Sequence, residues 1–126
     1  MRVLVCGGRN FNDYGLLTAK LDDVCYPRDA DEERTSNSVV TLFITGHCKG
    51  ADMMAEEYAK DEGIKNDIYP AEWDRYGKSA GYKRNTQMLV EGKPDLVVAF
   101  KGGVGTAMMV KIAMDAGVNV LDCREL

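Results

Sequence analysis

Three glycine-rich segments of this sequence have the composition of phosphate-binding loops. They are Cys6-Gly7-Gly8-Arg9-Asn10, Gly46-His47-Cys48-Lys49-Gly50 and Lys101-Gly102-Gly103-Val104-Gly105-Thr106. Each follows an apolar run and precedes a stretch with helical spacing. Glycine lets backbone amides approach a ligand closely, and the first turn of a helix offers free N–H groups with partial positive charge. We expect these segments to hold an anion such as phosphate, although glycine in strand-to-helix turns also has purely steric uses.

Two charged side chains lie beside these segments. Arg9 follows the first glycine pair, where its guanidinium could donate forked hydrogen bonds to a phosphate or carboxylate. Asp52 falls in the first helical turn after the second segment, where it could accept a hydrogen bond from a ribose hydroxyl. Both also have ordinary explanations, because surface arginines and carboxylates at helix starts are common.

A polar, glycine-containing helix start is predicted around residues 77–85. Helical spacing of three, four and seven places four residues on one face: Gly81, Arg84, Asn85 and Met88. A flat face of this kind could admit a ligand. Just upstream, Trp73 and Tyr76 suit either stacking on a base or a place against the sheet edge.

Histidine and cysteine give weaker signals. His47 is the only histidine, and no partner for acid–base chemistry is visible in the sequence. Four cysteines form no Cys-x-x-Cys pair, and we expect them to be mostly core residues: Cys6, Cys25, Cys48 and Cys123. Zinc held by Cys6, His47 and Cys48 is the alternative, but adjacent His-Cys is not usual ligand spacing. We expect no metal and no cofactor.

The elements that position these residues alternate between strand and helix. The predicted strands are 2–6, 39–45, 66–70, 95–100 and 118–121, and the predicted helices are 13–24, 50–62, 78–91 and 106–116. Gly63, Gly92 and Gly117 stand where left-handed helix ends are expected. Continuously apolar strands suit a parallel sheet that helices cover on both faces. The expected fold is a three-layer, Rossmann-like α/β domain with a mainly parallel five-stranded sheet.

Length and composition limit the alternatives. The 126 residues fit a single domain spanning 1–126, with Pro27–Ser38 as a flexible loop. The net charge of −4 argues against a surface that tracks nucleic acid. No apolar run is long enough to cross a membrane, and the first residues leave no room for a signal peptide. We therefore expect a cytoplasmic protein without a membrane partner.

Several short motifs resemble the SLOG superfamily and, within it, the YspA-like branch of short bacterial and phage proteins. The motifs are Gly-Gly-Arg-x-Phe-x-Asp (7–13), Gly-His-x-x-Gly-Ala-Asp (46–52), Ala-Glu-Trp-x-x-Tyr-Gly (71–77), Ala-Gly-x-x-Arg-Asn (80–85) and Gly-Gly-x-Gly-Thr (102–106). The resemblance implies a Rossmann-like domain that binds nucleotides or nucleotide-derived signals. It also implies that the glycine loops, Asp52 and Arg84 surround the pocket.

The same superfamily includes the LONELY GUY phosphoribohydrolases, whose motifs are Pro-Gly-Gly-x-Gly-Thr-x-x-Glu and Arg-Lys-x-x-Met. This sequence keeps the glycines, the threonine and the arginine, but has Met109 in place of the glutamate and Asn85 in place of the lysine. Cleavage of an N-glycosidic bond passes through a cation-like state that a carboxylate stabilises. Hydrolysis would therefore need another acid, and Asp52 or Glu56 on the neighbouring helix could supply it.

The first functional hypothesis is a module that senses or sequesters a phosphorylated, nucleotide-derived small molecule at the carboxyl ends of the strands. The predicted ligand-binding residues are Gly7, Gly8, Arg9, Gly46, His47, Gly50, Asp52, Arg84, Asn85, Gly102, Gly103, Gly105 and Thr106. The second hypothesis is a nucleotide N-glycosidase, a hydrolase in which Asp52, Glu56 and Arg84 are catalytic.

A third hypothesis, single-stranded nucleic-acid binding, follows the DNA-processing member of the superfamily, and the acidic charge argues against it. Homo-oligomerisation stays open because methionines that suit an adaptable interface also suit a core. They are Met53, Met54, Met108, Met109 and Met114.

Overall fold

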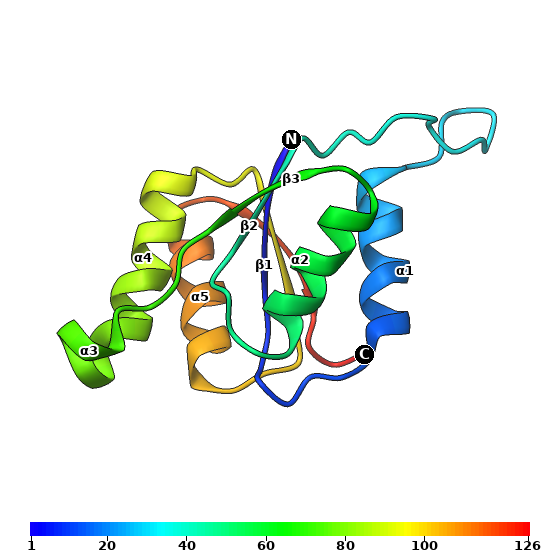
Figure 1. The fold of residues 1–126 in the computed structure, drawn as a ribbon. Coiled ribbons are helices and arrows are strands. Elements are labelled where there is room, and N and C mark those ends of the chain that lie inside the picture. Colours follow the sequence, from blue (N-terminus) through cyan, green and yellow to red (C-terminus); the bar gives the residue numbers. More distant parts are fainter.

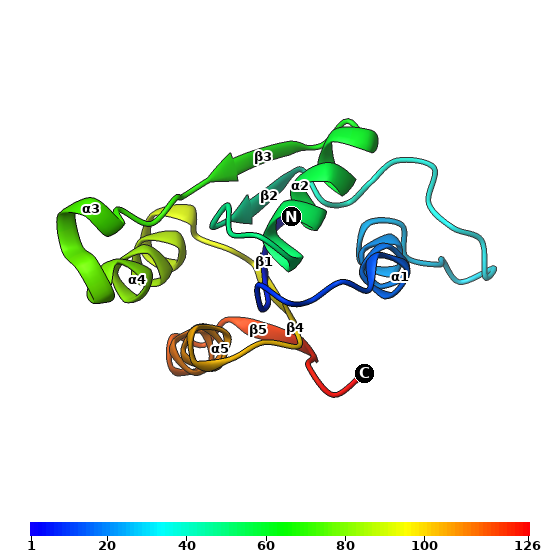
Figure 2. The ribbon, with the colours of Figure 1, turned by 60° about the horizontal axis from the view of Figure 1, so that its bottom comes forward.

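Five parallel strands form one sheet in the computed structural model, which describes all residues 1–126. The strands are β1 (Arg2–Cys6), β2 (Leu42–Thr45), β3 (Lys65–Ile68), β4 (Leu96–Phe100) and β5 (Asn119–Cys123). Their order across the sheet is β3-β2-β1-β4-β5, and every neighbouring pair is parallel (Figure 2). The predicted Rossmann-like α/β class is confirmed, and the sheet is entirely parallel.

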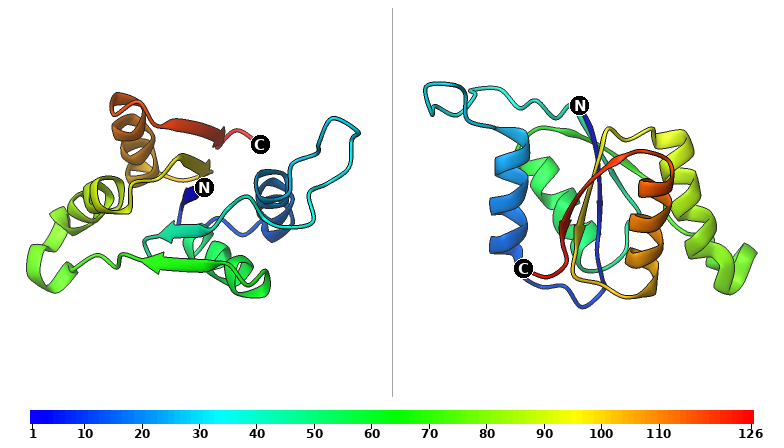
Figure 3. Two further views of the ribbon diagram at one scale, coloured as in Figure 1. Left: turned by 90° about the horizontal axis from the view of Figure 1, so that it is seen from above. Right: turned by 180° about the vertical axis from the view of Figure 1, so that it is seen from behind.

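The helices cover both faces of this sheet. They are α1 (Tyr14–Cys25), α2 (Ala51–Asp61), α3 (Trp73–Tyr76), the 3₁₀ turn η1 (Gly77–Ser79), α4 (Ala80–Gly92) and α5 (Val104–Asp115). Helices α1 and α2 lie on one face, and α4 and α5 lie on the other (Figures 1 and 3). None of the helices has the length and apolar composition that crossing a membrane requires.

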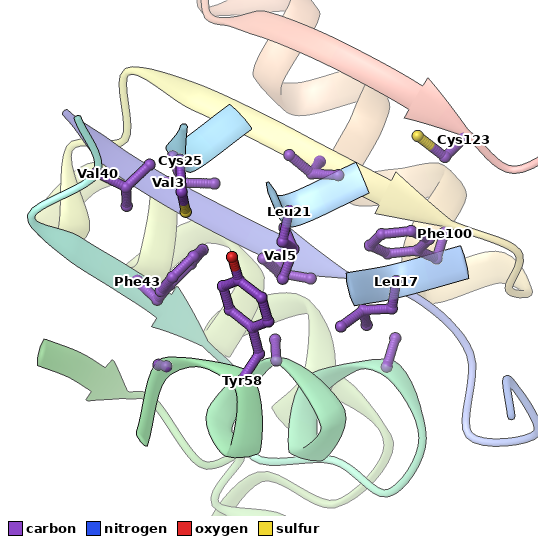
Figure 4. Packing of buried hydrophobic residues seen from close by; sticks show 14 residues of the cluster. Val3, Val5, Leu17, Leu21, Cys25, Val40, Phe43, Tyr58, Phe100 and Cys123 are labelled. Carbon is purple, nitrogen blue, oxygen red and sulfur yellow. The ribbon is translucent and has the colours of Figure 1, made fainter. Parts of the chain in front are cut away.

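Each inner strand supplies apolar side chains to both helical layers. Val3 and Val5 pack toward α1 and α2, whereas Leu4 and Cys6 pack toward α4 and α5. Successive side chains of a strand point to opposite faces, so a strand buried on both sides must be apolar throughout. Figure 4 shows the first of these cores, where Tyr58 rises from α2 between the sheet and α1. The two helices are also joined by a hydrogen bond, because the Tyr58 hydroxyl donates to Asp22 at 2.7 Å.

The strand order reverses at β1 and β4. After β1 the chain runs through α1, β2 and α2 to the β3 edge, and it then returns through α4 on the other face to β4. The loops that leave the carboxyl ends of β1 and β4 therefore lie side by side but lead to helices on opposite faces. In open parallel sheets this is the place where ligands bind.

The predicted element boundaries needed two main corrections. The helix expected at 78–91 begins as α4 only at Ala80, because Lys78 and Ser79 belong to η1, and Gly77 with φ 57° ends the preceding helix α3. The predicted left-handed glycines were confirmed at Gly63 and Gly117, with φ 68° and 76°. At Gly92 the prediction was wrong, because Lys93 adopts that conformation at φ 49°. Gly92 instead ends α4 where a Cβ would come within 3.0 Å of Ile44.

Residues 27–38 form an excursion between α1 and β2 at the amino ends of the strands (Figure 1). Within it, Arg28 and Arg34 form an antiparallel bridge, and the Asp29 carboxylate accepts hydrogen bonds from the N–H groups of Asp31 and Glu33. The excursion lies at the opposite end of the sheet from the glycine loops, so it does not contribute to the site described next.

Candidate functional site

A pocket of about 310 Å³ opens at the carboxyl ends of the strands, between the first glycine loop, the start of α2, helix α4 and the start of α5. Nine of the predicted site residues line it: Gly7, Gly8, Arg9, Asp52, Arg84, Asn85, Gly103, Gly105 and Thr106. The predicted α4 face lines it as well, because Gly81 and Met88 join Arg84 and Asn85 on the wall. Segments far apart in the sequence therefore meet at one hollow.

Arg84 and Asn85 connect the loops around this pocket. The Arg84 guanidinium donates to the carbonyl oxygen of Gly46 at 2.6 Å, and it lies 3.5 Å from the sulfur of Cys48. Its Nε donates to the Asn85 side chain at 3.1 Å, and the Asn85 amide in turn donates to the carbonyl oxygen of Gly105 at 3.1 Å. The Arg-Asn pair thus holds the loop after β2 and the start of α5 at a fixed separation.

Asp52 is the one carboxylate on the pocket wall, and its residue is only 5% exposed. Burial raises the pKa of Asp52 to about 6, while the hydrogen bond from the Cys48 N–H and the Arg84 charge oppose that rise. Burial disfavours the charged form of a carboxyl group. Asp52 can therefore hold or release a proton near neutral pH, beside any ligand in the pocket.

Two cationic side chains of the pocket have no counter-ion within the chain. Arg9 and Lys78 make no salt bridge and no hydrogen bond, and Arg9 only lies over the ring of Trp73 at 5.9 Å. With Arg84, the pocket wall carries three cations against the single carboxylate of Asp52. Such an excess of positive charge attracts an anionic ligand even though the chain as a whole is acidic.

Several loop glycines are explained by packing inside the protein. A Cβ on Gly46 would collide with the Arg84 guanidinium, and one on Gly102 would come within 2.7 Å of the Gly8 nitrogen. Gly50 has φ 95°, and its Cβ would overlap the Gly8 carbonyl oxygen. Gly46, Gly50 and Gly102 do not line the pocket, so their role is to let the loops approach one another.

Gly103 and Gly105 differ from those three. Both line the pocket, neither has a positive φ, and a Cβ on either would meet no atom within 4 Å. Gly105 is the second residue of α5, and glycine is a poorer helix former than alanine. Neither packing nor backbone conformation requires glycine there, whereas the close approach of a ligand to the backbone would.

His47 and Glu56 lie outside the pocket and bind each other. The His47 Nδ1 is 2.9 Å from one Glu56 oxygen, and the Thr45 hydroxyl donates to the other at 2.9 Å. His47 has a left-handed backbone with φ 58°, which turns the chain between β2 and α2. The partner that the sequence could not identify for His47 is therefore Glu56, and neither side chain lines the pocket.

Met109 lies in the apolar core between α5 and the sheet, with no exposed surface. Met109 is therefore not part of the pocket wall, and Asp52 is the only acidic residue that lines the pocket.

The His, Cys, Asp and Glu side chains form no group of three that could hold a metal ion. Cys6, Cys25 and Cys123 are buried, and Cys48 is half-buried beside Arg84.

The sequence reading did not assign four other lining residues to the site: Cys6, Cys48, Lys78 and Tyr82. A signal for two of them was present. Lys78, Gly81, Tyr82 and Asn85 are spaced by three, four and seven, so extending the α4 face back by one turn would have included them. Cys6 and Cys48 belong to the first two glycine-rich segments, but only the way the strand ends meet shows that they line the pocket.

Comparison with known proteins agrees with this architecture. The model of the "YspA, cpYpsA-related SLOG family" matches residues 1–76, which is more than half of the chain. The chain belongs to the SLOG family. The resemblance inferred from the motifs is thereby confirmed, and the matched range covers the first two glycine loops and Asp52.

This SLOG protein is also similar in sequence to a phage protein and in structure to a bacterial DNA-processing protein. The Gene 61 protein of Mycobacterium phage D29 is 30% identical over 128 residues, covering 96% of this chain and 94% of the phage protein. The solved structure of DNA processing protein A (DprA) from Streptococcus pneumoniae superposes with a TM-score of 0.67 at 18% identity. That superposition covers 96% of this chain but 49% of DprA, so the likeness concerns the fold of about half of DprA.

Proposed function

We propose that this SLOG protein binds a phosphorylated, nucleotide-derived small molecule in the pocket at the carboxyl ends of the strands, as a sensor or sequestering module. One observation carries the proposal: the unpaired cations Arg9 and Lys78 share a pocket with the open backbone of Gly103 and Gly105. Free N–H groups at the start of α5 and a local excess of positive charge both favour phosphate.

The other lining residues suit the remainder of a nucleotide. Asp52 can accept a hydrogen bond from a ribose hydroxyl, as acids beside phosphate-binding loops do. The Thr106 residue lines the same wall directly after Gly105, and its hydroxyl makes no hydrogen bond within the chain. Trp73, which is 46% exposed, and Tyr82 offer aromatic surface at the same wall for stacking on a base.

The test uses Trp73 as a reporter, since it is the only tryptophan of the chain. Purified protein is titrated with the four nucleoside monophosphates, the corresponding diphosphates, ribose 5-phosphate and unphosphorylated nucleosides. We expect phosphorylated compounds to raise the melting temperature, because a ligand that binds only the folded state stabilises it. Nucleotides should also quench the Trp73 fluorescence, and ribose 5-phosphate should not.

A Trp73→Phe variant controls for optical artefacts, because it should keep the thermal shift while losing the fluorescence change. Absence of any thermal shift across the whole panel at millimolar concentration would contradict the proposal. Binding that requires an oligonucleotide, with log affinity falling linearly with log salt concentration, would instead identify a single-stranded nucleic acid as the ligand.

The pKa of Asp52, about 6, favours a second candidate function, that of a nucleotide N-glycosidase. In that reaction the bond between the anomeric carbon and the base nitrogen breaks. Water supplies hydroxide to the carbon, and a proton goes to the nitrogen. A carboxyl group that is partly protonated near neutral pH can donate that proton. Arg84 would orient the phosphate, whereas Glu56 is bound to His47 and Thr45 outside the pocket.

This second function predicts free base and ribose 5-phosphate from one of the bound nucleoside monophosphates. Release measured by chromatography should fall at least about tenfold in Asp52→Asn, while the thermal shift by the same nucleotide is retained. A Glu56→Gln variant should keep the release, since Glu56 lies outside the pocket. Failure to detect base from any nucleotide that binds would leave binding as the function.

A further inference from the structure

A second hollow, of about 550 Å³, adjoins the pocket on the α1 side of the glycine loops. Its own walls come from the loop between β1 and α1, the start of α1, the end of β4 and the segment after β5. They are Asn10, Phe11, Asn12, Asp13, Leu16, Lys101, Gly102 and Leu126. Three residues line both hollows: Gly8, Arg9 and Gly103. The two spaces are therefore neighbours that share a border, and the proposed function uses only the first.

The border between the two hollows is built from glycine backbone. The Gly8 N–H donates to the Lys101 carbonyl oxygen at 2.9 Å, and a Cβ on Gly8 would lie 2.9 Å from the Gly102 Cα. The contact between Gly8 and Gly102 leaves no space for a side chain on Gly8. We call the border, formed by Gly8, Gly102 and Gly103, the glycine ridge. Arg9 belongs to both hollows and carries an unpaired positive charge next to the ridge.

The second hollow has the chemistry of a site for a neutral polar group. The side-chain amides of Asn10 and Asn12 make no hydrogen bond within the chain, so both donors and acceptors are free. The Phe11 ring, packed on Phe100 at a centroid distance of 5.1 Å, provides apolar surface. Arg9 and Lys101 are set against the Asp13 carboxylate, so the excess of charge is smaller than in the first pocket.

The topology places the ridge at the reversal of strand order. β1 and β4 are neighbours in the sheet, and the ridge residues follow their carboxyl ends (Figure 2). Helices leave this point toward opposite faces, which opens a hollow on each side. A ligand with two bulky halves and a linear anionic bridge fits that arrangement, because each half can occupy one hollow while the bridge passes Arg9 and the uncapped start of α5.

We propose that a single ligand of the dinucleoside diphosphate or nucleoside diphosphate sugar class occupies both hollows. One nucleoside lies in the first pocket, the diphosphate crosses the glycine ridge beside Arg9, and a second nucleoside or sugar lies against Asn10 and Asn12. This inference rests on the proposed function and specifies its ligand. It makes the second half of the ligand a determinant of affinity.

The test compares, for each of the four common bases, the nucleoside diphosphate with the symmetrical dinucleoside diphosphate, for example ADP with diadenosine diphosphate. Both compounds carry two phosphates, and the dinucleoside compound has the second nucleoside in place of one ionisable oxygen of the terminal phosphate. Tighter binding of the less charged compound must therefore come from the second nucleoside. We expect the dinucleoside compound to bind at least about tenfold more tightly for the base that binds best, as measured by calorimetry and Trp73 quenching. The nucleoside diphosphate glucose of each base is titrated in the same way. If neither the dinucleoside compound nor the sugar compound of any base binds more tightly than its nucleoside diphosphate, the inference is overturned and the proposed function stays intact.

An Asn10→Ala/Asn12→Ala variant tests whether the tighter binding of the dinucleoside compound comes from the second hollow. Both side chains are exposed and make no hydrogen bond, so the substitutions should not disturb folding. The dinucleoside compound should then bind only as tightly as the nucleoside diphosphate, whose own affinity should not change. Asn119→Ala, at the exposed amino end of β5, is the matched control and should change neither affinity. A gain that survives the double substitution also overturns the inference, whereas failure of every nucleotide to bind contradicts the proposed function itself.

Discussion

Helices α1 and α5 start in a similar way, but only the first turn of α1 has a side-chain cap. Both helices follow a glycine-containing loop at the carboxyl end of a central strand, and both have glycine as their second residue, Gly15 and Gly105. Helix α1 completes its own first turn, because the Asp13 carboxylate accepts a hydrogen bond from the Leu16 N–H at 3.0 Å. Helix α5 begins at Val104, and its N-cap residue, Gly103, has no side chain that could accept such a hydrogen bond.

The first turn of a helix leaves backbone N–H groups unsatisfied, and proteins usually fill them with a capping side chain, water or a ligand. In α1 the chain supplies a carboxylate of its own. In α5 the chain supplies no such group, and the first residues of the helix, Gly105 and Thr106, line a pocket with unpaired cations. The first turn of α1 is therefore capped by the chain itself, and the uncapped start of α5 supports the proposal that it binds an external anion.

The largest expected effect comes from giving both helices the same new carboxylate. An aspartate at the second helical position is compatible with the helix dipole, so Gly105→Asp and Gly15→Asp should each leave the free energy of unfolding nearly unchanged or slightly increased. Gly105→Asp should nevertheless weaken nucleotide binding by at least about 100-fold, because like charges placed together cost several kcal/mol. Calorimetric titration with the best nucleotide measures this. Equal affinities for the two variants would remove the proposed distinction between the helices.

The next comparison is between Asp13 and Asp52, two aspartates near the glycine loops that each accept a backbone N–H group. Asp13 is exposed, whereas Asp52 is buried and its pKa rises from 3.8 to about 6. Because folding raises this pKa, Asp52 stabilises the fold most below pH 4, and that stability is lost as the pH rises through 6. The loss is about 3 kcal/mol for a shift of about 2 pKa units.

Asp52→Asn should therefore flatten the pH dependence of the free energy of unfolding between pH 4 and 6, the two ends of the Asp52 shift. Above pH 6 the variant should equal or exceed the wild type in stability. Asp13→Asn is the exposed control and should retain the wild-type slope. Denaturant unfolding at a series of pH values measures both, and an unchanged slope in Asp52→Asn would mean that Asp52 is not the group responsible.

The loop between β4 and α5 holds two neighbouring glycines, Gly102 and Gly103, whose substitutions should have different effects. A Cβ at Gly102 would come within 2.7 Å of the Gly8 nitrogen, so Gly102→Ala should cost about 1–3 kcal/mol of stability. A Cβ at Gly103 would meet nothing within 4 Å, so Gly103→Ala should fold normally but weaken nucleotide binding. Thermal unfolding with and without nucleotide separates the two effects. Equal loss of stability in both variants would contradict the packing argument.

The smallest expected effect concerns the cap of α1. Asp13→Ala removes the acceptor for the Leu16 N–H and should reduce the free energy of unfolding by about 1 kcal/mol. Mononucleotide affinity should stay the same, because Asp13 does not line the first pocket. Denaturant unfolding and calorimetry check these two expectations. A reduced mononucleotide affinity would show that the two helix starts are coupled.

Much of the fold and part of the site could be predicted from local patterns. The apolar runs correctly predicted the strands, whose side chains fill the two cores on either side of the sheet. The helical spacing also predicted a face that does line the pocket, formed by Gly81, Arg84, Asn85 and Met88. The boundary between α3 and α4 was missed because it depends on a single left-handed glycine, Gly77. Composition cannot distinguish such a turn from an ordinary helical glycine.

The sequence by itself determined that glycine loops, Arg9 and Asp52 would gather at one end of a parallel sheet, because strand–helix alternation forces every strand to end on the same side. Only the tertiary structure decided which glycines serve packing and which stay open, since that depends on distances between loops from different strands. It also paired His47 with Glu56 outside the pocket and buried Met109 in the core. Short-range patterns specify secondary structure, whereas the surroundings of a side chain depend on segments that are distant in the sequence.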